Sequence, residues 1–352
     1  MADGERVARH GWLSSDLGSR SDLQLASLVD RAAPLGTGIG GTSALLEIDR
    51  TPVFVKRIRL TDIERKMSNV ESTANLFGLP ANCQYGVGSP GFGAWRELAA
   101  CTKTTDLVLT GLSDAFPLLY HWRVLPGVGP RSGDAASVER EVAFWGGSSA
   151  LRGRLSALAD ATASLALFME FVPHTLQGWL SAQVKAGRAA TEAAAVFLES
   201  QLLPTVDLMN AAGIHHFDTH FGNVLTDGRQ LYFSDFGLAT SPSFDLSELE
   251  ARFLYENRTH DPAYAAMRLV NWLVTAFAGL DPACKVEERN GLICALADGA
   301  QVAGAPEVAL RLLDRLAPAA AVMNGFYYEL FTWSRAARYP AYRVAEALGA
   351  RS

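Results

Sequence analysis

Hydrophobic and polar residues alternate in the amino-terminal half of the chain in a way that predicts β-strands. From Leu35 the sequence LGTGIGGTSALLEIDRTPVFVKRI contains a glycine-rich turn, an apolar stretch, a polar turn at residues 49–52 and a β-branched stretch. Short apolar runs bounded by Gly, Pro and Asp are typical of strands joined by tight turns. FPLLYHWRVLPG and ASLALFMEFV have the same character. The pattern predicts three antiparallel strands over residues 35–58 and two strands after them.

Apolar residues recur at helical spacing in most of the remaining chain. The segment AWRELAACTKTTD predicts a helix, and from Thr175 onward Ala and Leu follow the same spacing almost throughout. Residues 61–80 are compatible with a helix that Pro80 ends, whereas YGVGSPGFG, residues 85–93, is typical of a loop. We therefore expect an α+β protein with a small antiparallel β-rich lobe and a larger, mainly helical lobe.

The same pattern suggests three regions. Residues 1–33 form a leader, polar apart from an amphipathic stretch at 23–29, which we expect to pack on the body of the protein. Residues 34–173 form the β-rich lobe with an insertion at about 60–93, and residues 174–352 form the helical lobe.

Composition narrows the classes of partner. The 352 residues are 49% hydrophobic and 19% charged, with a formal net charge of −6 and no polybasic arm, so neither nucleic acid nor an anionic membrane is an expected partner. The amino terminus lacks an apolar signal core, and the apolar runs are far shorter than the roughly 20 residues of a membrane span. We expect a cytoplasmic protein. Its four cysteines form no C-x-x-C pair and are predicted to be reduced core residues.

The densest group of polar residues lies in HHFDTHFGNVLTDGRQLYFSDFGLA, residues 215–239. Two short apolar strands flank Asp-Gly at 227–228, a strong signal for a tight hairpin. A hairpin returns its two ends to one place, so we expect Asn223 and Asp235 to lie side by side, with Asp218 in the loop that leads into the first strand. Their oxygen atoms suit a hard cation such as Mg²⁺.

The spacing HFDTHFGN followed by DFG resembles the catalytic loop and metal-binding motif of the protein-kinase-like superfamily, H-x-D-x-x-x-x-N and then D-F-G. The resemblance implies the two-lobed protein-kinase-like fold and the use of ATP and Mg²⁺. It also implies that Asp218 orients or deprotonates the acceptor hydroxyl and that Asn223 and Asp235 hold Mg²⁺. His220 is similar to the histidine at this position in aminoglycoside and choline kinases, and would donate a hydrogen bond to the transferring phosphoryl group.

The amino-terminal half offers matches to the same family. Gly36, Gly38 and Gly41 fit G-x-G-x-x-G, whose backbone N–H groups would cover the nucleotide phosphates. Lys56 ends the strand VFVK and resembles the lysine that pairs with the phosphates. We expect Glu97 to fix its ammonium group, with Glu64 and Glu71 as alternatives.

The strand ASLALFMEFV resembles the segment that holds the adenine base. Met169 would face the adenine, and the backbone from Glu170 to Val172 would bond to it. Two departures from the family pattern stand out. Phe54 occupies the position of a small alanine above the adenine, and Phe217 replaces the arginine that pairs with a phosphorylated activation loop, so we expect that switch to be absent.

The chain after DFG has no A-P-E motif and a short segment before helical spacing resumes near Leu246. Little room remains for an extended peptide, so the leading interpretation is a kinase that transfers the γ-phosphoryl group of ATP to a hydroxyl, with a small-molecule acceptor slightly favoured over a protein. The aromatic residues at 326–343 could line an acceptor site or close the core.

Three alternatives stay open. One is a protein serine/threonine kinase, and another is a nucleotide-binding pseudokinase acting as a scaffold or sensor, which would bind Mg·ATP without turnover. The third is a metal hydrolase that uses Asp218, Asn223 and Asp235, although it leaves Lys56 and the glycine turn unexplained.

Overall fold

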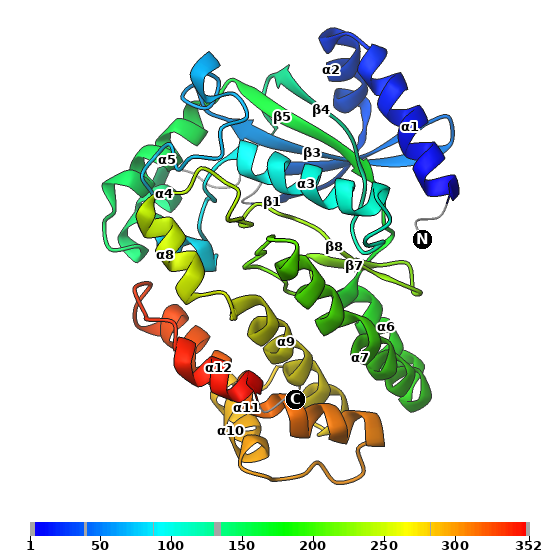
Figure 1. The fold of residues 1–352 in the computed structure, drawn as a ribbon, viewed down its shortest axis with the longest axis vertical. Helices are drawn as coiled ribbons and strands as arrows, with labels where there is room; N and C mark the ends of the chain where they lie inside the picture. Colours follow the sequence, from blue (N-terminus) through cyan, green and yellow to red (C-terminus); the bar gives the residue numbers. More distant parts are fainter. Residues whose placement is uncertain (1–3, 39–40, 87, 130–134, 282, 350–352) are drawn as a thin grey trace. The chain divides into compact units, whose positions relative to one another are not determined.

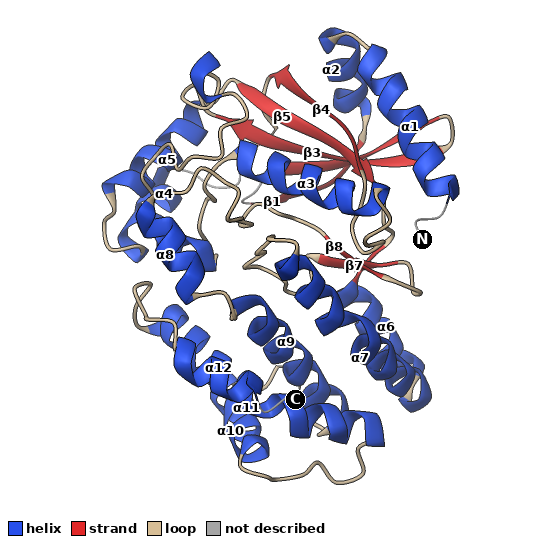
Figure 2. Cartoon of the chain, in the orientation of Figure 1, coloured by secondary structure: helices blue, strands red, loops and turns tan. Residues whose placement is uncertain are grey.

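The computed structural model describes residues 4–38, 41–86, 88–129, 135–281 and 283–349, and it shows an α+β protein (Figures 1 and 2). The chain divides into two compact units. The first contains residues up to Pro173 together with 232–251, and the second contains residues 174–231 and those from 252 onward. The segment that follows the predicted hairpin therefore belongs to the first unit.

A five-stranded antiparallel sheet forms the centre of the first unit (Figure 2). Its strands are β1 Ala33–Gly38, β2 Gly41–Ile48, β3 Thr51–Leu60, β4 Leu119–Pro126 and β5 Ala163–Glu170, in the order β1-β2-β3-β5-β4. Asp49 and Arg50 join β2 to β3 with positive φ angles of 46° and 65°, the geometry of a tight hairpin turn. The predicted strands are confirmed.

The first unit also contains helices. They are α1 Gly4–Ser19, α2 Asp22–Arg31, α3 Ala94–Leu109, α4 Ala135–Phe144 and α5 Ser149–Asp160. α3, predicted from its spacing, packs against β3 and β4, whereas α1 and α2 lie along β4 (Figure 1). The sequence pattern did not predict α4 and α5.

The amino-terminal region is more ordered than its polar composition suggested, because it forms two helices. α1 buries Leu13 and Leu17, and Ser21 begins α2 with a capping box completed by Gln24. The Arg6 side chain is 9% exposed and its guanidinium pairs with the Glu170 carboxylate at the end of β5, with 2.6 Å between Nη2 and Oε2. This buried pair fastens α1 to the sheet.

The prediction of a helix over residues 61–80 is wrong. This segment contains only the 3₁₀ turn η1 Met67–Asn69, and the next turn is η2 Ala81–Tyr85. Its apolar side chains pack into a small core that includes Leu79 and Phe92 of the insertion and Trp145 and Leu151 from the α4–α5 region. Tertiary packing against a distant part of the chain thus takes the place of a local helix.

The second unit is mainly helical (Figure 2). Its helices are α6 Leu176–Ala186, α7 Arg188–Ala211, α9 His260–Phe277, α10 Val286–Ala297, α11 Glu307–Thr332 and α12 Ala341–Gly349, while α8 Glu248–Glu256 crosses the boundary between the units. α9 packs against α7 and α11. In the predicted aromatic segment, Phe326 and Tyr327 are buried whereas Trp333 and Tyr342 are exposed.

The predicted hairpin is present. β7 Val224–Thr226 and β8 Leu231–Phe233 are neighbours in a three-stranded sheet, with β6 His174–Thr175 on the other side of β7. Gly228 has a φ of 87°, and the Asp227 carboxylate accepts the backbone N–H groups of Arg229 and Gln230. The boundary between the two units falls inside β8.

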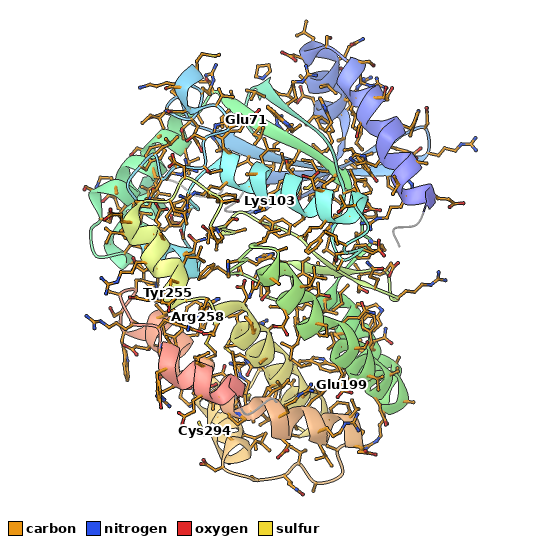
Figure 3. All side chains as sticks on the ribbon, in the orientation of Figure 1. Glu71, Lys103, Glu199, Tyr255, Arg258 and Cys294 are labelled. Atoms are coloured by element: carbon orange, nitrogen blue, oxygen red, sulfur yellow. The ribbon has the colours of Figure 1, made fainter. Side chains whose placement is uncertain are left out.

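Two expectations about the surface can be compared with the structure. All four cysteines are free thiols, but only Cys83 and Cys101 are buried, so the prediction of four core cysteines is wrong. Cys294 is exposed on α10, where Ile293 and Leu296 occupy the buried face instead (Figure 3). Among the described residues, no helix has the length and apolar character needed to cross a membrane.

Candidate functional site

A buried lysine in the first unit contacts two carboxylates from distant parts of the chain. Lys56 Nζ, on β3, lies 2.6 Å from Glu97 Oε1 on α3 and 2.8 Å from Asp235 Oδ1. The side chains of Lys56 and Glu97 are 9% and 4% exposed, whereas the Asp235 side chain is 46% exposed. The buried Glu97 carboxylate therefore fixes the position of the Lys56 ammonium group. The ammonium group in turn holds the carboxylate of Asp235, which solvent can reach.

Electrostatics fixes the charge on this lysine. Burial opposes the charged form, but the carboxylates of Asp235 and Glu97 outweigh it and raise the pKa of Lys56 above its ordinary value. Burial raises the pKa of Glu97 to about 7, although the Lys56 charge acts in the opposite direction. With both acids ionised the three groups carry one surplus negative charge, which a cation would offset.

Neither alternative carboxylate contacts Lys56. Glu71 is exposed in the insertion (Figure 3). Glu64 is 1% exposed and has a different set of partners. One carboxylate oxygen accepts the backbone N–H of Ala94 at 2.9 Å, at the first residue of α3, and the other lies 3.0 Å from the Arg154 guanidinium. Glu64 thus fixes the beginning of the helix that carries Glu97.

The backbone around Asp235 is strained and closely surrounded. Asp235 has a φ of 59°, which non-glycine residues adopt rarely and mostly where neighbouring structure imposes it. Gly91 lies so near that a Cβ atom on it would be 2.8 Å from the Gly237 carbonyl oxygen. The Gln84 side chain donates a hydrogen bond to the Leu238 carbonyl. The insertion therefore packs directly on the residues after Asp235.

The predicted glycine turn joins β1 to β2. Gly36 and Gly38 lie in β1, and Gly41 begins β2 opposite Gly38, whereas residues 39 and 40 fall outside the described part of the chain. Gly41 has a φ of 130°, and a Cβ atom on it would lie 2.1 Å from the Arg57 carbonyl oxygen. Only glycine fits at this position.

The strand predicted to hold the base lies next to the lysine strand. Met169 pairs with Phe54 across β5 and β3, and Leu167 pairs with Lys56. Met169 and Glu170 are half-buried and Val172 is buried. Two of the residues singled out from the sequence, Phe54 and Met169, therefore occupy one register position on adjacent strands.

The loop before β7, in the second unit, brings together two more predicted residues. Asn223 Nδ2 donates hydrogen bonds of 3.0 Å to the Asp218 backbone carbonyl and to Asp218 Oδ2. Because one amide group bridges the backbone and the side chain of the same residue, Asn223 fixes the direction of the Asp218 carboxylate. This carboxylate is 30% exposed.

The geometry of His220 defines its tautomer. Nδ1 accepts the backbone N–H of Gly222 at 3.0 Å, so the proton of the neutral imidazole lies on Nε2, which is 3.8 Å from Asp218 Oδ2. A Cβ atom at position 222 would lie 2.7 Å from the ring, so glycine is needed there. His220 therefore presents a donor beside the Asp218 carboxylate.

The sequence analysis missed Asp261, whose side chain supports this loop by binding backbone groups of the loop. Its buried carboxylate accepts the backbone N–H groups of His216 at 2.7 Å and Phe217 at 2.8 Å. Phe217 has a φ of 61° and stacks on His260. Burial alone would raise the pKa of Asp261, but its hydrogen bond with His260 and the nearby imidazoles lower it. Asp261 carries no motif, so the sequence analysis did not single it out.

The predicted site residues thus form two groups, one in each unit. Lys56, Glu97 and Asp235 meet in the first unit, and Asp218, His220 and Asn223 meet in the second. Within the described residues, no group of three or more His, Cys, Asp or Glu side chains could hold a metal ion. Asp235 and Asn223, one in each unit, are the predicted oxygen ligands.

No model of a known protein family matches the chain, and no curated protein matches its sequence.

Proposed function

We propose that the protein is an ATP- and Mg²⁺-dependent kinase that transfers the γ-phosphoryl group to a hydroxyl group. The observation that carries this proposal is the buried Lys56 ammonium, held by Glu97 on a helix and by Asp235 of the D-F-G sequence. In protein kinases a strand lysine paired with a helix glutamate and a D-F-G aspartate must all be in place for phosphoryl transfer. The two-lobed protein-kinase-like fold is part of the same proposal.

The residues of this chain have distinct roles in the proposed reaction. Lys56 neutralises phosphate charge, and Glu97 keeps its ammonium group in position. Asp218 accepts the proton of the acceptor hydroxyl, because its carboxylate is partly exposed and Asn223 fixes its direction. His220 donates a hydrogen bond from Nε2 to the transferring group.

The chemistry of the two predicted ligands, a carboxylate and an amide, suits Mg²⁺. The Asp235 side chain is 46% exposed and its carboxylate can accept a cation from solvent, and Asn223 adds an amide oxygen. Oxygen ligands of this kind, few in number and completed by phosphate and water, are what Mg²⁺ prefers. When bound, the ion would neutralise charge on the phosphates.

The length of the segment after Asp235 bears on which acceptor we propose. This segment is short and reaches α8 at Glu248, so we propose a small-molecule alcohol as the acceptor before a protein serine or threonine. The cytoplasmic location expected from the sequence fits a reaction that consumes ATP. A pseudokinase is disfavoured because every catalytic residue expected from the motif is present.

Labelled ATP tests the proposal. The purified protein is incubated with γ-labelled ATP, Mg²⁺ and a desalted or whole extract of its source cells, with Asp218→Asn as the control. We expect wild-type-specific label in acid-soluble small molecules. Label in acid-precipitable protein would identify a protein kinase, and ATP binding without label in either fraction would identify a pseudokinase.

Removing the Asp235 carboxylate should weaken nucleotide binding only when Mg²⁺ is present. Asp235→Ala deletes the exposed acid but leaves the Lys56–Glu97 pair, and the expected loss of affinity for Mg·ATP is at least about 10-fold, because the loss of even an outer-shell partner of a metal ligand costs this much. Calorimetry with and without Mg²⁺ measures the difference. An affinity for Mg·ATP equal to that of the wild type would remove Asp235 from the metal site.

A further inference from the structure

The segment after Asp235 is fastened along its length to the insertion and to α3. Residues 237–250, here called the post-Asp235 segment, begin beside Gly91 and Gln84 of the insertion. Farther along, the backbone N–H of Asp245 donates to Thr73 Oγ1 at 2.8 Å. The insertion, to which the sequence assigned no role, therefore contacts both the beginning and the middle of this segment.

α3 holds the same segment at two further points. Lys103, labelled in Figure 3, donates to the hydroxyl oxygen atoms of Ser241 at 3.0 Å and Ser243 at 2.9 Å. Arg96 Nη2 lies 2.6 Å from Glu250 Oε1, and both side chains are buried. The contacts of α3 thus reach from the middle of the segment to its last residue.

Arg96 joins all three elements. Its Nε donates to the Thr73 carbonyl at 2.6 Å, and its guanidinium lies 4.8 Å from the centre of the Phe92 ring, so it contacts the insertion on two sides. Its partner Glu250 also accepts the backbone N–H and the hydroxyl of Ser247, which caps the beginning of α8. A single buried side chain therefore connects the insertion, α3 and the first turn of α8.

Arg96 is also the neighbour of Glu97 in the sequence. Glu97 reaches Asp235 through Lys56, and Arg96 reaches Glu250, so consecutive residues of one helix fix both ends of the chain between positions 235 and 250. A buried, paired arginine is costly to form without its partner, because an unpaired charge would remain in the interior. Such a pair favours one arrangement of the segment over partly detached ones.

We propose that Arg96 is a positioning residue that holds the post-Asp235 segment in its working arrangement without covalent modification. This inference rests on the proposed kinase function. In this proposal the insertion permanently supports the post-Asp235 segment, which follows the predicted metal ligand Asp235. Phosphorylation of Ser241 or Ser243, next to Lys103, is the competing way to order the segment, and the experiment distinguishes the two.

The test combines two measurements on the full chain. Hydrogen–deuterium exchange of backbone amides reports the order of residues 237–250 and needs no catalytic activity. Steady-state kinetics separates kcat from the KM for ATP. The variant is Arg96→Met with Glu250→Gln, which removes both charges and leaves neither buried alone. The matched control is Arg65→Met, which breaks an exposed pair with Asp62 in the same insertion.

We expect slow exchange in the wild type, unchanged by phosphatase treatment or by Ser241→Ala with Ser243→Ala. The double charge variant should exchange faster across residues 237–250 and lose about 10-fold to 100-fold in kcat, with the KM for ATP unchanged, because the segment is displaced while the nucleotide still binds. Arg65→Met should behave as the wild type.

Two results would overturn the inference. One is unchanged exchange in the double variant, and the other is fast exchange in phosphatase-treated wild type that slows when Ser241 or Ser243 is phosphorylated. Should the double variant fail to fold, Lys103→Met is measured in its place, with faster exchange expected at 241–243. Wild-type protein that shows the expected exchange but transfers no phosphoryl group would refute the proposed function and leave the support by Arg96 standing.

Discussion

Replacing Asp218 with Asn should lower the rate of phosphoryl transfer by about 10²-fold to 10⁴-fold, because an amide cannot accept the acceptor's proton. The local structure should survive. The side-chain oxygen of the new amide can still accept the 3.0 Å hydrogen bond from Asn223 Nδ2, and the backbone carbonyl keeps the second bond. ATP binding should therefore persist while turnover is lost.

The measurement pairs turnover with binding. ADP release in the presence of the identified acceptor gives kcat, and calorimetry gives the affinity for Mg·ATP. Asp207→Asn, an exposed acid on α7 in the same unit, is the matched control and should leave both quantities unchanged. Full activity of Asp218→Asn would remove this residue from the mechanism.

Replacing Glu64 with Gln should reduce the free energy of unfolding by about 3 to 5 kcal/mol, because it leaves the buried Arg154 charge without its partner. The glutamine has one side-chain oxygen, so it can accept the donors of Thr61 or the N–H of Ala94 but not both, and the loss combines the unpaired Arg154 charge with one lost acceptor. Urea denaturation measures the difference. Glu71→Gln, exposed in the same insertion, should have no measurable effect, and an equally small effect of Glu64→Gln would contradict the assignment.

The Glu64 effect should also depend on pH. Burial alone would raise the pKa of Glu64, but the Arg154 charge and the hydrogen bonds from Thr61 and Ala94 outweigh it and lower the pKa below its ordinary value of 4.5. A carboxyl group with a lowered pKa in the folded state contributes its stability above pH 4.5 and loses it as the pH falls toward the folded value. The difference between wild type and Glu64→Gln should therefore shrink below pH 4.5.

Local patterns predicted the strands, α3 and the hairpin around Gly228, because these depend on turn chemistry and on the spacing of neighbouring residues. The pattern was misleading where long-range contacts decide the structure. Leu79 and Phe92 gain burial from Trp145 and Leu151, so the insertion packs as turns and not as a helix. The sequence of residues 61–80 contains no signal that predicts packing against Trp145 and Leu151.

The candidate site shows the same division. Lys56, Asp218, Asn223 and Asp235 were found through the spacing of their motifs, and Glu97 through its place on the expected helix. Asp261 and Arg96 carry no motif, because their importance lies in partners far along the chain. The two residues of the Arg96–Glu250 pair, for example, are 154 positions apart in the sequence, and only the folding of the chain brings them together.

The Arg6–Glu170 pair has a consequence for protein synthesis. The two residues are 164 positions apart, so α1 leaves the ribosome long before its docking partner exists, by about 10 to 30 seconds at usual rates of translation. During this interval the apolar face with Leu13 and Leu17 has no sheet to cover it. The first unit also needs residues 232–251, which follow residues 174–231 of the second unit. The first unit therefore completes its fold only after residues 232–251 have been translated, and we expect chaperones to shield α1 of the nascent protein until then.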